Sequence, residues 1–305
     1  MTAEGICKKV IGVFSGAIDI VVLVVVVFVL GYAGYALWDS QQIYLEAESS
    51  QYSVYKPTEQ NEGKSFVELQ SINPEVFAWL TVYGTNIDYP VVQGENNMKY
   101  VTLKAEGMYS ITGAIFLDSK NKNDFSDFNN ILYGHHMDRK AMFGEIGTFA
   151  DKEIFESRLY GNLYYDGEDY GIEFFAFVHA DAYDSSVFNV RVKEEARKEY
   201  LEGLFDKAVY TRKIGLTTND RIVLLSTCSN TSTNGRDILV GRITNTAYDN
   251  PFITEAENTR GATVEGIWNA SLDRYTQGLL IFALILAILL FLLSCVIRRG
   301  RVKKG

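Results

Sequence analysis

The sequence contains few cysteine, histidine and proline residues. Three Cys, three His and four Pro occur among its 305 residues. Cys7 and Cys295 lie at or inside two hydrophobic stretches near the chain ends, which leaves Cys228 as the one cysteine between those stretches. An internal disulfide is therefore excluded there. A lone Cys at a strand end is often a small buried apolar residue, but a lone thiol in an exported domain is a candidate reactive group.

The scarcity of histidine bears on metal binding. His135 and His136 are adjacent and could supply half of a metal site, whereas a zinc site requires three or four ligands. The third histidine, His179, falls within an apolar strand-like run, where a packing role is the simpler interpretation. We therefore expect neither a metal ion nor another cofactor.

Basic residues are outnumbered by acidic ones. The chain has 29 Lys and Arg against 38 Asp and Glu, which gives a net charge of −9. A negatively charged surface repels phosphates, so nucleic acid is excluded as a partner. A hydrophobic content of 47% is enough for one sizeable core, and 19 Tyr with 18 Phe favour a β-rich body over disorder.

A hydrophobic stretch follows the short N-terminal segment 1–9. It runs over 10–38, which is long enough to cross a bilayer, and we predict a transmembrane helix there. A cleaved signal peptide is the alternative, but the stretch is too long and ends in the aromatic belt Tyr32–Trp38 rather than at a cleavage site. Asp19 is costly in lipid, and we assign it no function.

A second stretch, Leu279–Ile297, has no charged residue, and it predicts another transmembrane helix over 277–297. The basic tail 298–305 follows it. Positive charge thus flanks the outer side of both stretches, so we expect both termini in the cytoplasm and the region between them outside the cell membrane. Two helices buried in a soluble core are the alternative, which these flanks disfavour.

The region between the two stretches divides into three parts. We predict a helical stalk over 39–71, a β-rich domain over 72–247 and a polar linker over 248–276. Helical spacing of apolar residues predicts one amphipathic helix at Val192–Ala208, laid across the β body. Many short strands separated by turns favour a sandwich or a barrel. The strands are expected at Val76–Val82, Ile87–Val92, Ala114–Leu117, Asn130–Tyr133, Asn162–Tyr165, Ile172–His179, Arg221–Leu225 and Ile238–Ile243.

The stretch from Arg221 to Ile243 has the strongest chemical signal. An apolar strand ends in Ser226, Thr227 and Cys228, a polar loop follows, and Arg236 opens the next strand. If the two strands pair antiparallel, Cys228 and Arg236 face each other across the mouth of the loop. A thiol and a guanidinium that meet at a strand end indicate chemistry rather than packing.

A second polar loop follows the strand that ends at Tyr133 and Gly134. It begins with His135 and His136, and a histidine in that position can act as a general acid or base. An exposed histidine pair without a function is the alternative. With a Cys228 thiolate as nucleophile, Arg236 would stabilise an oxyanion and His135 would transfer protons. Ser226 and Thr227 could add hydroxyl or backbone donors, and no Asp or Asn is evident as an orienting third member.

These motifs resemble those of the sortases, the cysteine transpeptidases of Gram-positive bacterial surfaces. The resemblance extends over about Ile72–Thr244 and includes class B features such as the inserted helix near 192–208. The three segments that resemble the catalytic motifs are YGHHM at Tyr133–Met137, LLSTC at Leu224–Cys228 and the strand that opens with Arg236. Further segments with class B character are INPEV at Ile72–Val76, GTNIDYPVVQ at Gly84–Gln93, GAIFLD at Gly113–Asp118 and MFGEI at Met142–Ile146.

The resemblance implies a mainly β fold: a closed barrel of about eight strands with N-terminal helices and one inserted helix, here flanked by two transmembrane helices. It implies the nucleophile Cys228, the acid His135 rather than His136, and Arg236 as the third catalytic residue. Class B substrate-groove positions are similar to five residues of this chain. They are Asn97, Val101, Tyr133, Ser226 and Thr227.

The expected function is therefore that of a membrane-anchored class B sortase. It would cleave a C-terminal sorting motif of secreted surface proteins, hold the product as a thioester on Cys228, and transfer it to an amine of the peptidoglycan cross-bridge. The alternative acceptor is a pilin lysine. A second membrane span is more common in pilus-building sortases, but the Asp-Pro-aromatic lid of class C pilus enzymes is absent from the sequence.

Two other functions would use the same residues differently. A non-catalytic, membrane-tethered binding domain would keep Cys228 buried and inert. A hydrolytic cysteine protease would use the same three residues but pass the acyl group to water rather than to an amine.

Overall fold

The computed structural model describes residues 3–57, 64–229 and 233–252. The predicted second span, 277–297, and the tail 298–305 lie outside the described residues, as does most of the predicted linker. The chain divides into a helical segment that ends at Gln42 and a compact unit that begins at Ile43.

A long helix, α1, covers Ala3–Ala47 and includes the whole of the predicted first span. The helical stretch Ala3–Tyr55 contains an 18-residue window of mean hydropathy 2.9, none of it buried, so it is long and apolar enough to cross a membrane by length and composition. Helical structure continues into the predicted stalk. It consists there of the end of α1, the 3-10 helix η1 at Ser49–Tyr55 and the helix α2 at Lys64–Ile72.

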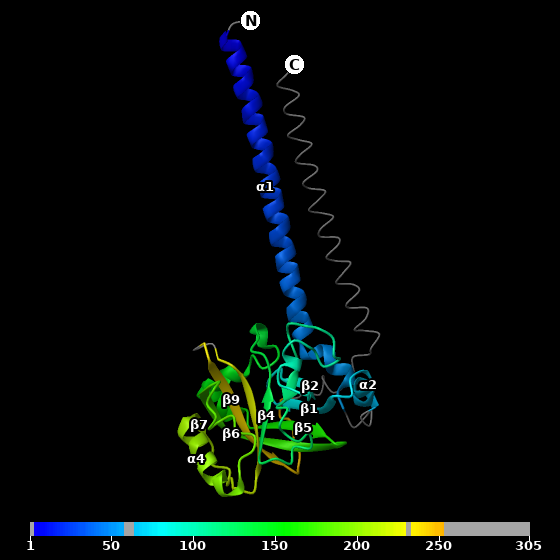
Figure 1. Ribbon diagram of the computed structural model, residues 1–305, viewed down its shortest axis with the longest axis vertical. Coiled ribbons are helices and arrows are strands. Elements are labelled where there is room, and N and C mark those ends of the chain that lie inside the picture. Colours follow the sequence, from blue (N-terminus) through cyan, green and yellow to red (C-terminus); the bar gives the residue numbers. More distant parts are fainter. Residues whose placement is uncertain (1–2, 58–63, 230–232, 253–305) are drawn as a thin grey trace. The chain divides into compact units, whose positions relative to one another are not determined.

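Nine strands form a single sheet in the order β5-β1-β2-β3-β4-β8-β9-β6-β7. Because β5 also pairs with β6, the sheet closes into a barrel of eight strands, and β7 pairs with β6 beyond the residues that pair with β5 (Figure 1). The predicted mainly β fold with about eight barrel strands is therefore confirmed. The strands are β1 Val76–Val82, β2 Asp88–Val92, β3 Ile115–Leu117, β4 Asn129–Tyr133, β5 Tyr160–Tyr165, β6 Glu168–Asp181, β7 Ala208–Thr211, β8 Arg221–Cys228 and β9 Gly235–Thr244.

Two apolar clusters lie on the two faces of this sheet, because successive side chains of a strand point to opposite sides. In β8, Val223 and Leu225 belong to the larger cluster, whereas Ile222 and Leu224 belong to the smaller one. Strand β9 divides in the same way, with Leu239 in the larger cluster and its neighbours in the smaller. Both faces of these strands are buried, which explains why they read as continuous apolar runs in the sequence.

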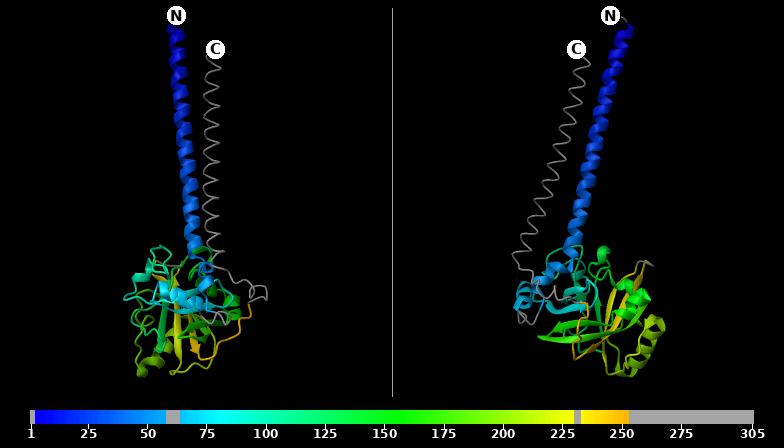
Figure 2. Two further views of the ribbon diagram at one scale, coloured as in Figure 1. Left: turned by 90° about the vertical axis from the view of Figure 1, so that its right-hand side faces the viewer. Right: turned by 180° about the vertical axis from the view of Figure 1, so that it is seen from behind.

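The helix α4, at Arg197–Lys207, covers the smaller cluster and lies beside β6 and β7 (Figures 1 and 2). Its buried residues Tyr200, Leu201 and Leu204 have helical spacing, as predicted. The helix is shorter than the predicted range because Glu194–Ala196 forms a 3-10 turn and Ala208 already pairs with β6. The remaining short helices are η2 Lys99–Val101, η3 Asp138–Lys140, η4 Ile146–Ala150 and α3 Lys152–Ser157.

Candidate active site

The candidate site lies at one end of three neighbouring strands, β4, β8 and β9. Strands β4 and β8 are parallel, with Tyr133 opposite Ser226, and the Gly134 amide donates a hydrogen bond to the Ser226 carbonyl at 3.2 Å. Parallel strands end at the same edge, so His135 and Cys228 leave their strands side by side. Strand β9 pairs antiparallel with β8 and places Arg236 directly opposite Cys228, which confirms the predicted pairing.

Strand geometry also places Cys228 and Arg236 on the same face of the sheet. Even-numbered residues of β8 and β9, such as Leu224 and Val240, belong to the smaller apolar cluster, and Cys228 and Arg236 continue that alternation. Cys228 is exposed, and Arg236 is half-buried. A sealed, inert thiol, as a purely structural cysteine would have, is therefore contradicted by the structure.

The His135 imidazole is held by a backbone carbonyl. Its Nε2 atom lies 2.8 Å from the Val101 oxygen. Because a carbonyl oxygen only accepts hydrogen bonds, Nε2 is the protonated nitrogen in this arrangement. The Val101 carbonyl thus fixes the ring orientation, the function that an Asp or Asn performs in a catalytic triad.

The loop after His135 is anchored at two points. The Phe143 amide donates to the His135 carbonyl at 3.0 Å, and the Met142 amide donates to the Tyr89 hydroxyl at 2.9 Å. His136 forms a β-bridge with Met142. His179 lies apart on β6, where its Nδ1 atom is 2.7 Å from an Asp237 oxygen. Of the three histidines, His135 is the one that strand pairing places beside Cys228.

A hydrogen-bonded cluster connects the predicted groove residues Asn97 and Tyr133. The buried carboxylate of Asp118 accepts from Asn97 Nδ2 at 2.7 Å and from the Tyr133 hydroxyl at 3.2 Å. Asn97 Oδ1 in turn accepts from the Ser119 amide at 2.7 Å. The Asn97 side chain is thus engaged within the protein by Asp118 and Ser119.

Tyr133 is a central member of this cluster. Burial raises the pKa of Tyr133, and the charge of Asp118 raises it further, against the opposing effect of the Arg236 charge. The hydroxyl therefore stays protonated and donates to Asp118 at neutral pH. The Phe188 ring stacks on Tyr133 with a centroid separation of 6.4 Å. Tyr133 thus connects the catalytic end of β4 with the segment that follows β6.

The two predicted residues before Cys228 lie on different faces of β8. Both are buried, and neither hydroxyl oxygen has a hydrogen-bond partner among the described residues. Ser226 shares the face of Cys228, whereas Thr227 faces the opposite side with Val223 and Leu225. Ser226 thus lies on the face of β8 that carries Cys228, and Thr227 lies on the opposite face.

Sequence reasoning missed the structural basis of three contributions. Asp118 is not among the predicted site residues, although a carboxylate directly after a buried strand, here β3, is a usable signal. Val101 is predicted only as a substrate-groove position, and the sequence does not show that its carbonyl contacts His135. Phe188 lies more than fifty positions from Tyr133 in the sequence, and no local pattern indicates their contact.

Gly113 offers a test of the His135 geometry. Its φ is +62°, and a Cβ there would lie 2.8 Å from the Val101 oxygen and 3.0 Å from His135 Cδ2. We expect Gly113→Ala to destabilise the fold by about 1–2 kcal/mol and to lower kcat by roughly tenfold or more, because it displaces His135. Steady-state kinetics and thermal unfolding measure the two effects.

Gly107→Ala is the matched control for this prediction. Gly107 also has a positive φ, +82°, but the nearest atom to an added Cβ is Asn73 Nδ2 at 4.0 Å. It should lose about 1 kcal/mol of stability from the positive φ, without the steric contacts present at Gly113, and it should retain kcat. Equal kcat in the two variants would show that His135 does not depend on this contact.

Within residues 3–57, 64–229 and 233–252, no group of three His, Cys, Asp or Glu side chains is arranged to hold a metal ion. The chemistry available from the described residues is that of a thiol, an imidazole and a guanidinium at one sheet edge.

Comparison with known proteins places this arrangement in a family. No family model matches the chain. The chain is 30% identical over 179 residues to Sortase B of Listeria monocytogenes, which covers 58% of this chain and 72% of that protein.

Two solved structures are also similar. Sortase B from the Type II pilus of Streptococcus pneumoniae has 45% identity and a TM-score of 0.52, covering 59% of this chain and 98% of that one. A Streptococcus pyogenes class B sortase involved in pilus biogenesis has 41% identity and a TM-score of 0.55, covering 60% and 99%.

The similarity to these sortases, together with a closed eight-stranded barrel and an exposed cysteine that faces an arginine across one strand end, identifies a cysteine transpeptidase of the sortase type. The relationship to the Listeria protein is close enough in identity and coverage to assign the family. This chain belongs to the class B sortases.

Proposed function

We propose that this sortase cleaves a C-terminal sorting motif of secreted surface proteins and joins the new carboxyl end to an amine. The observation that carries the proposal is the strand register that sets Cys228 opposite Arg236 and brings His135 to the same edge. Three groups of complementary chemistry meet there, and the thiol is open to a substrate.

The first half of the reaction forms an acyl-enzyme. The Cys228 sulfur, as thiolate, attacks the carbonyl carbon of the scissile peptide bond, and Arg236 stabilises the oxyanion. The C–N bond then breaks, and the departing amine takes a proton from His135. The product is a thioester between Cys228 and the substrate.

The second half transfers the acyl group. An acceptor amine attacks the thioester carbonyl and gives its proton to His135, which restores the imidazolium. The C–S bond breaks as the new C–N bond forms, so the Cys228 thiolate is regenerated. At the end of the cycle Cys228 is again a thiolate and His135 is again an imidazolium.

The amine acceptor that we propose first is a lysine of a pilin subunit. Two similar structures, at 45% and 41% identity, are sortases of the Type II pilus and of pilus biogenesis. This similarity reverses the order expected from the sequence, in which attachment to the peptidoglycan cross-bridge came first. Wall attachment is the second candidate.

We further propose that α1 anchors the enzyme in the cell membrane with the barrel outside. The apolar window in the stretch Ala3–Tyr55 supports one span. A second span over 277–297 and a cytoplasmic position of both termini belong to the same proposal. Anchoring near the site where substrates emerge raises the effective concentration of the sorting motif at the enzyme. A weak affinity for the motif is then sufficient for cleavage.

Product analysis tests this proposal and separates the acceptors. The full-length enzyme is incubated with candidate pilin and wall-protein sorting peptides and with either a pilin lysine peptide or a cross-bridge peptide. Mass spectrometry then identifies the joined products. We expect an isopeptide product with the lysine peptide, formed at least tenfold faster than hydrolysis.

Each other product has a defined meaning. A joined product only with the cross-bridge peptide would establish wall attachment in place of pilus assembly. Release of free carboxylate at the same rate with and without amine would identify a hydrolytic protease. Absence of any cleavage, with an unreactive Cys228, would support a non-catalytic binding domain.

A further inference from the structure

The loop His135–Phe143, called here the histidine loop, has an unusual backbone. Three of its non-glycine residues have a positive φ: Arg139 at +56°, Lys140 at +65° and Met142 at +52°. Such conformations are uncommon, because the β-carbon is crowded by the backbone there, and they persist only where surrounding contacts hold them. The conformation of the histidine loop therefore depends on what it is attached to.

A short ladder within the loop transmits the position of Met142 to His135. Met142 forms a β-bridge with His136, and the Phe143 amide donates to the His135 carbonyl at 3.0 Å. The His135 ring is held in turn at Nε2 by the Val101 carbonyl, 2.8 Å away. A displacement of Met142 therefore moves the His135 backbone and disturbs the contact that orients the imidazole.

The Tyr89 hydroxyl connects Met142 with the end of α1. It donates to the Ala47 carbonyl at 2.8 Å and accepts from the Met142 amide at 2.9 Å. The direction of both bonds is fixed, because a carbonyl only accepts and a backbone amide only donates. Ala47 is the last residue of α1, and the last carbonyls of a helix lack partners within it. Burial raises the pKa of Tyr89, so the hydroxyl keeps the proton that it donates.

A second contact joins the same turn of α1 to the histidine loop. The Arg139 guanidinium lies over the Tyr44 ring, 4.3 Å from its centroid, and the Tyr44 hydroxyl donates to an Asp138 carboxylate oxygen at 3.4 Å. A cation over an aromatic face is attracted by the ring quadrupole. The α1 residues Ile43–Ala47 belong to the same compact unit as the barrel. One helical turn thus holds the histidine loop at two points.

We propose that Tyr89 and Tyr44 are positioning residues for proton transfer: they link the histidine loop to the end of α1 and so keep His135 in its productive orientation. The inference rests on the proposed function, in which His135 protonates the departing amine and deprotonates the acceptor. Both groups bound by the Tyr89 hydroxyl are backbone atoms, so the hydroxyl is the part of this link that a substitution can remove. A displacement of about 1 Å at a reacting group can lower a rate by roughly 10²-fold.

Tyr89→Phe removes the hydroxyl and retains the ring. The full-length enzyme in nonionic detergent is assayed for transfer of a sorting peptide to an amine. We expect kcat to fall roughly fivefold to twentyfold while KM stays within about twofold, because the released loop moves His135 rather than the substrate groove. The melting temperature should fall by about 2–6 °C, since a buried hydroxyl with two hydrogen bonds is lost.

Tyr83→Phe is the matched control. Tyr83 is also buried, and its hydroxyl donates to a backbone carbonyl outside the histidine loop, that of Tyr248, at 2.9 Å. The control should lose a similar amount of thermal stability and keep kcat within about twofold. An equal loss of kcat in both variants would overturn the proposal, because the effect would then follow from stability alone. Full kcat in Tyr89→Phe would also overturn it.

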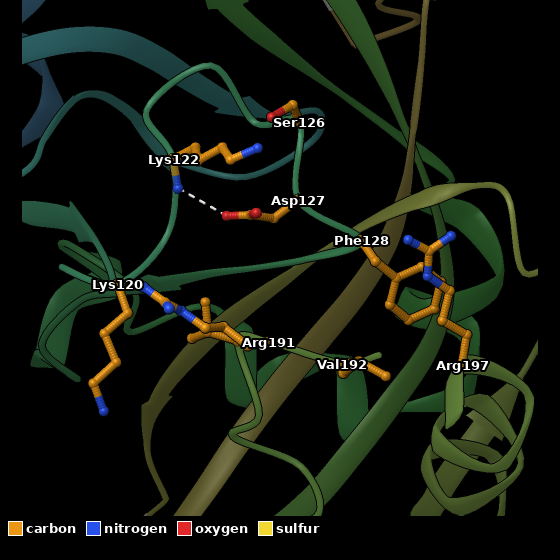
Figure 3. A pocket seen from close by; sticks show the side chains of 9 residues that line it. Lys120, Lys122, Ser126, Asp127, Phe128, Arg191, Val192 and Arg197 are labelled. Atoms are coloured by element: carbon orange, nitrogen blue, oxygen red, sulfur yellow. Dashed lines mark hydrogen bonds between the residues drawn. The ribbon is translucent and has the colours of Figure 1, made fainter. Parts of the chain in front are cut away.

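Tyr44→Ala tests the second contact, with Tyr44→Phe as the conservative variant. We expect alanine to lower kcat roughly threefold to tenfold, and phenylalanine, which keeps the ring beneath Arg139, to restore it to within about twofold. Arg197→Gln is the control. The Arg197 guanidinium lies over the Phe128 ring, 5.0 Å from its centroid, in a separate pocket at the start of β4 (Figure 3). Full kcat in Tyr44→Ala, or an equal loss in Arg197→Gln, would overturn the role of Tyr44.

A measurement without substrate distinguishes failure of this link from failure of the proposed function. The chain has three histidines, so ¹⁵N labelling of their rings gives few signals, which are assigned by replacing each histidine in turn with glutamine. In the neutral imidazole of His135 the Val101 contact selects the tautomer protonated at Nε2, which ¹⁵N chemical shifts identify. We expect a mixture of tautomers at His135 in Tyr89→Phe and an unchanged signal in Tyr83→Phe.

The two kinds of failure then give different results. A tautomer that depends on Tyr89, in a chain that carries out no transfer, overturns the proposed function alone. Transfer by the unmodified chain, with the same His135 signal and the same kcat in Tyr89→Phe, overturns the link alone.

Discussion

Replacing Cys228 by alanine is expected to lower kcat/KM by about 10⁴-fold or more, because no other described thiol lies at the candidate site. The acyl-enzyme cannot form without this sulfur, so both cleavage and transfer should be lost together. The substitution removes an exposed side chain at the end of β8 and leaves the barrel core intact. Thermal unfolding of the variant should therefore match that of the unmodified protein.

Covalent trapping is the direct measurement for this prediction. A sorting peptide that carries a thiol-reactive group in place of the scissile bond should add its mass to the unmodified chain and to Cys7→Ala, but not to Cys228→Ala. Cys7 is a suitable control because it is an exposed thiol in α1, outside the barrel strands. An adduct that persists in Cys228→Ala would show that the nucleophile has been assigned incorrectly.

Replacing Arg236 by lysine is expected to lower kcat by roughly 10²–10³-fold while KM changes little. Lysine retains the positive charge but not the planar, forked donor set of the guanidinium. In the structure one arm of that fork, Nη1, donates to the Gly235 carbonyl at 3.0 Å, which leaves the other donors available for an oxyanion. An interaction that forms only in the transition state affects kcat and kcat/KM equally.

Arg242→Lys is the control on the same strand. Arg242 is ion-paired with Glu173 near the other end of β9, so the substitution should leave kcat within twofold. If Arg236→Lys keeps full activity, charge alone is sufficient at that position and forked donation to an oxyanion is excluded. If KM rises while kcat is unchanged, Arg236 binds the substrate rather than the transition state.

Both predictions depend on strand register. Cys228 and Arg236 meet because β8 and β9 pair without a bulge from Arg221 opposite Ile243 to the loop. A slip of either strand by one residue would turn its side chains to the opposite face of the sheet and separate Cys228 from Arg236. The two-sided burial of these strands makes such a slip expensive, since Leu224 and Val240 would exchange places with residues of the other cluster. Core packing thus maintains the geometry of the site.

Much of the site could be predicted from local patterns. An apolar run that ends in Ser-Thr-Cys, a polar loop and an arginine indicate a hairpin with a thiol facing a guanidinium, and the structure confirms that pairing. The histidine after Gly134 was similarly evident as a polar residue at a strand end. The number of short strands with turn signals between them favoured a sandwich or a barrel, and the resemblance to the sortases implied the closed barrel.

Other contacts could not be read in this way. The parallel pairing of β4 with β8, which sets His135 beside Cys228, joins segments about ninety residues apart. The Val101 carbonyl that orients His135 is a backbone group, and every residue has one. The two sides of β8, which separate Ser226 from Thr227, become distinct functionally only when the sheet closes.

The sequence by itself determined which chemical groups are available, which strands carry them, and that a thiol and a guanidinium face each other, because side-chain chemistry, hydrophobic periodicity and a short hairpin loop are local properties. Only the tertiary structure decided how His135 is brought beside them and which carbonyl holds its ring. Those arrangements depend on the order in which distant strands close the barrel, and that order is set by burial over the whole core rather than by any one segment.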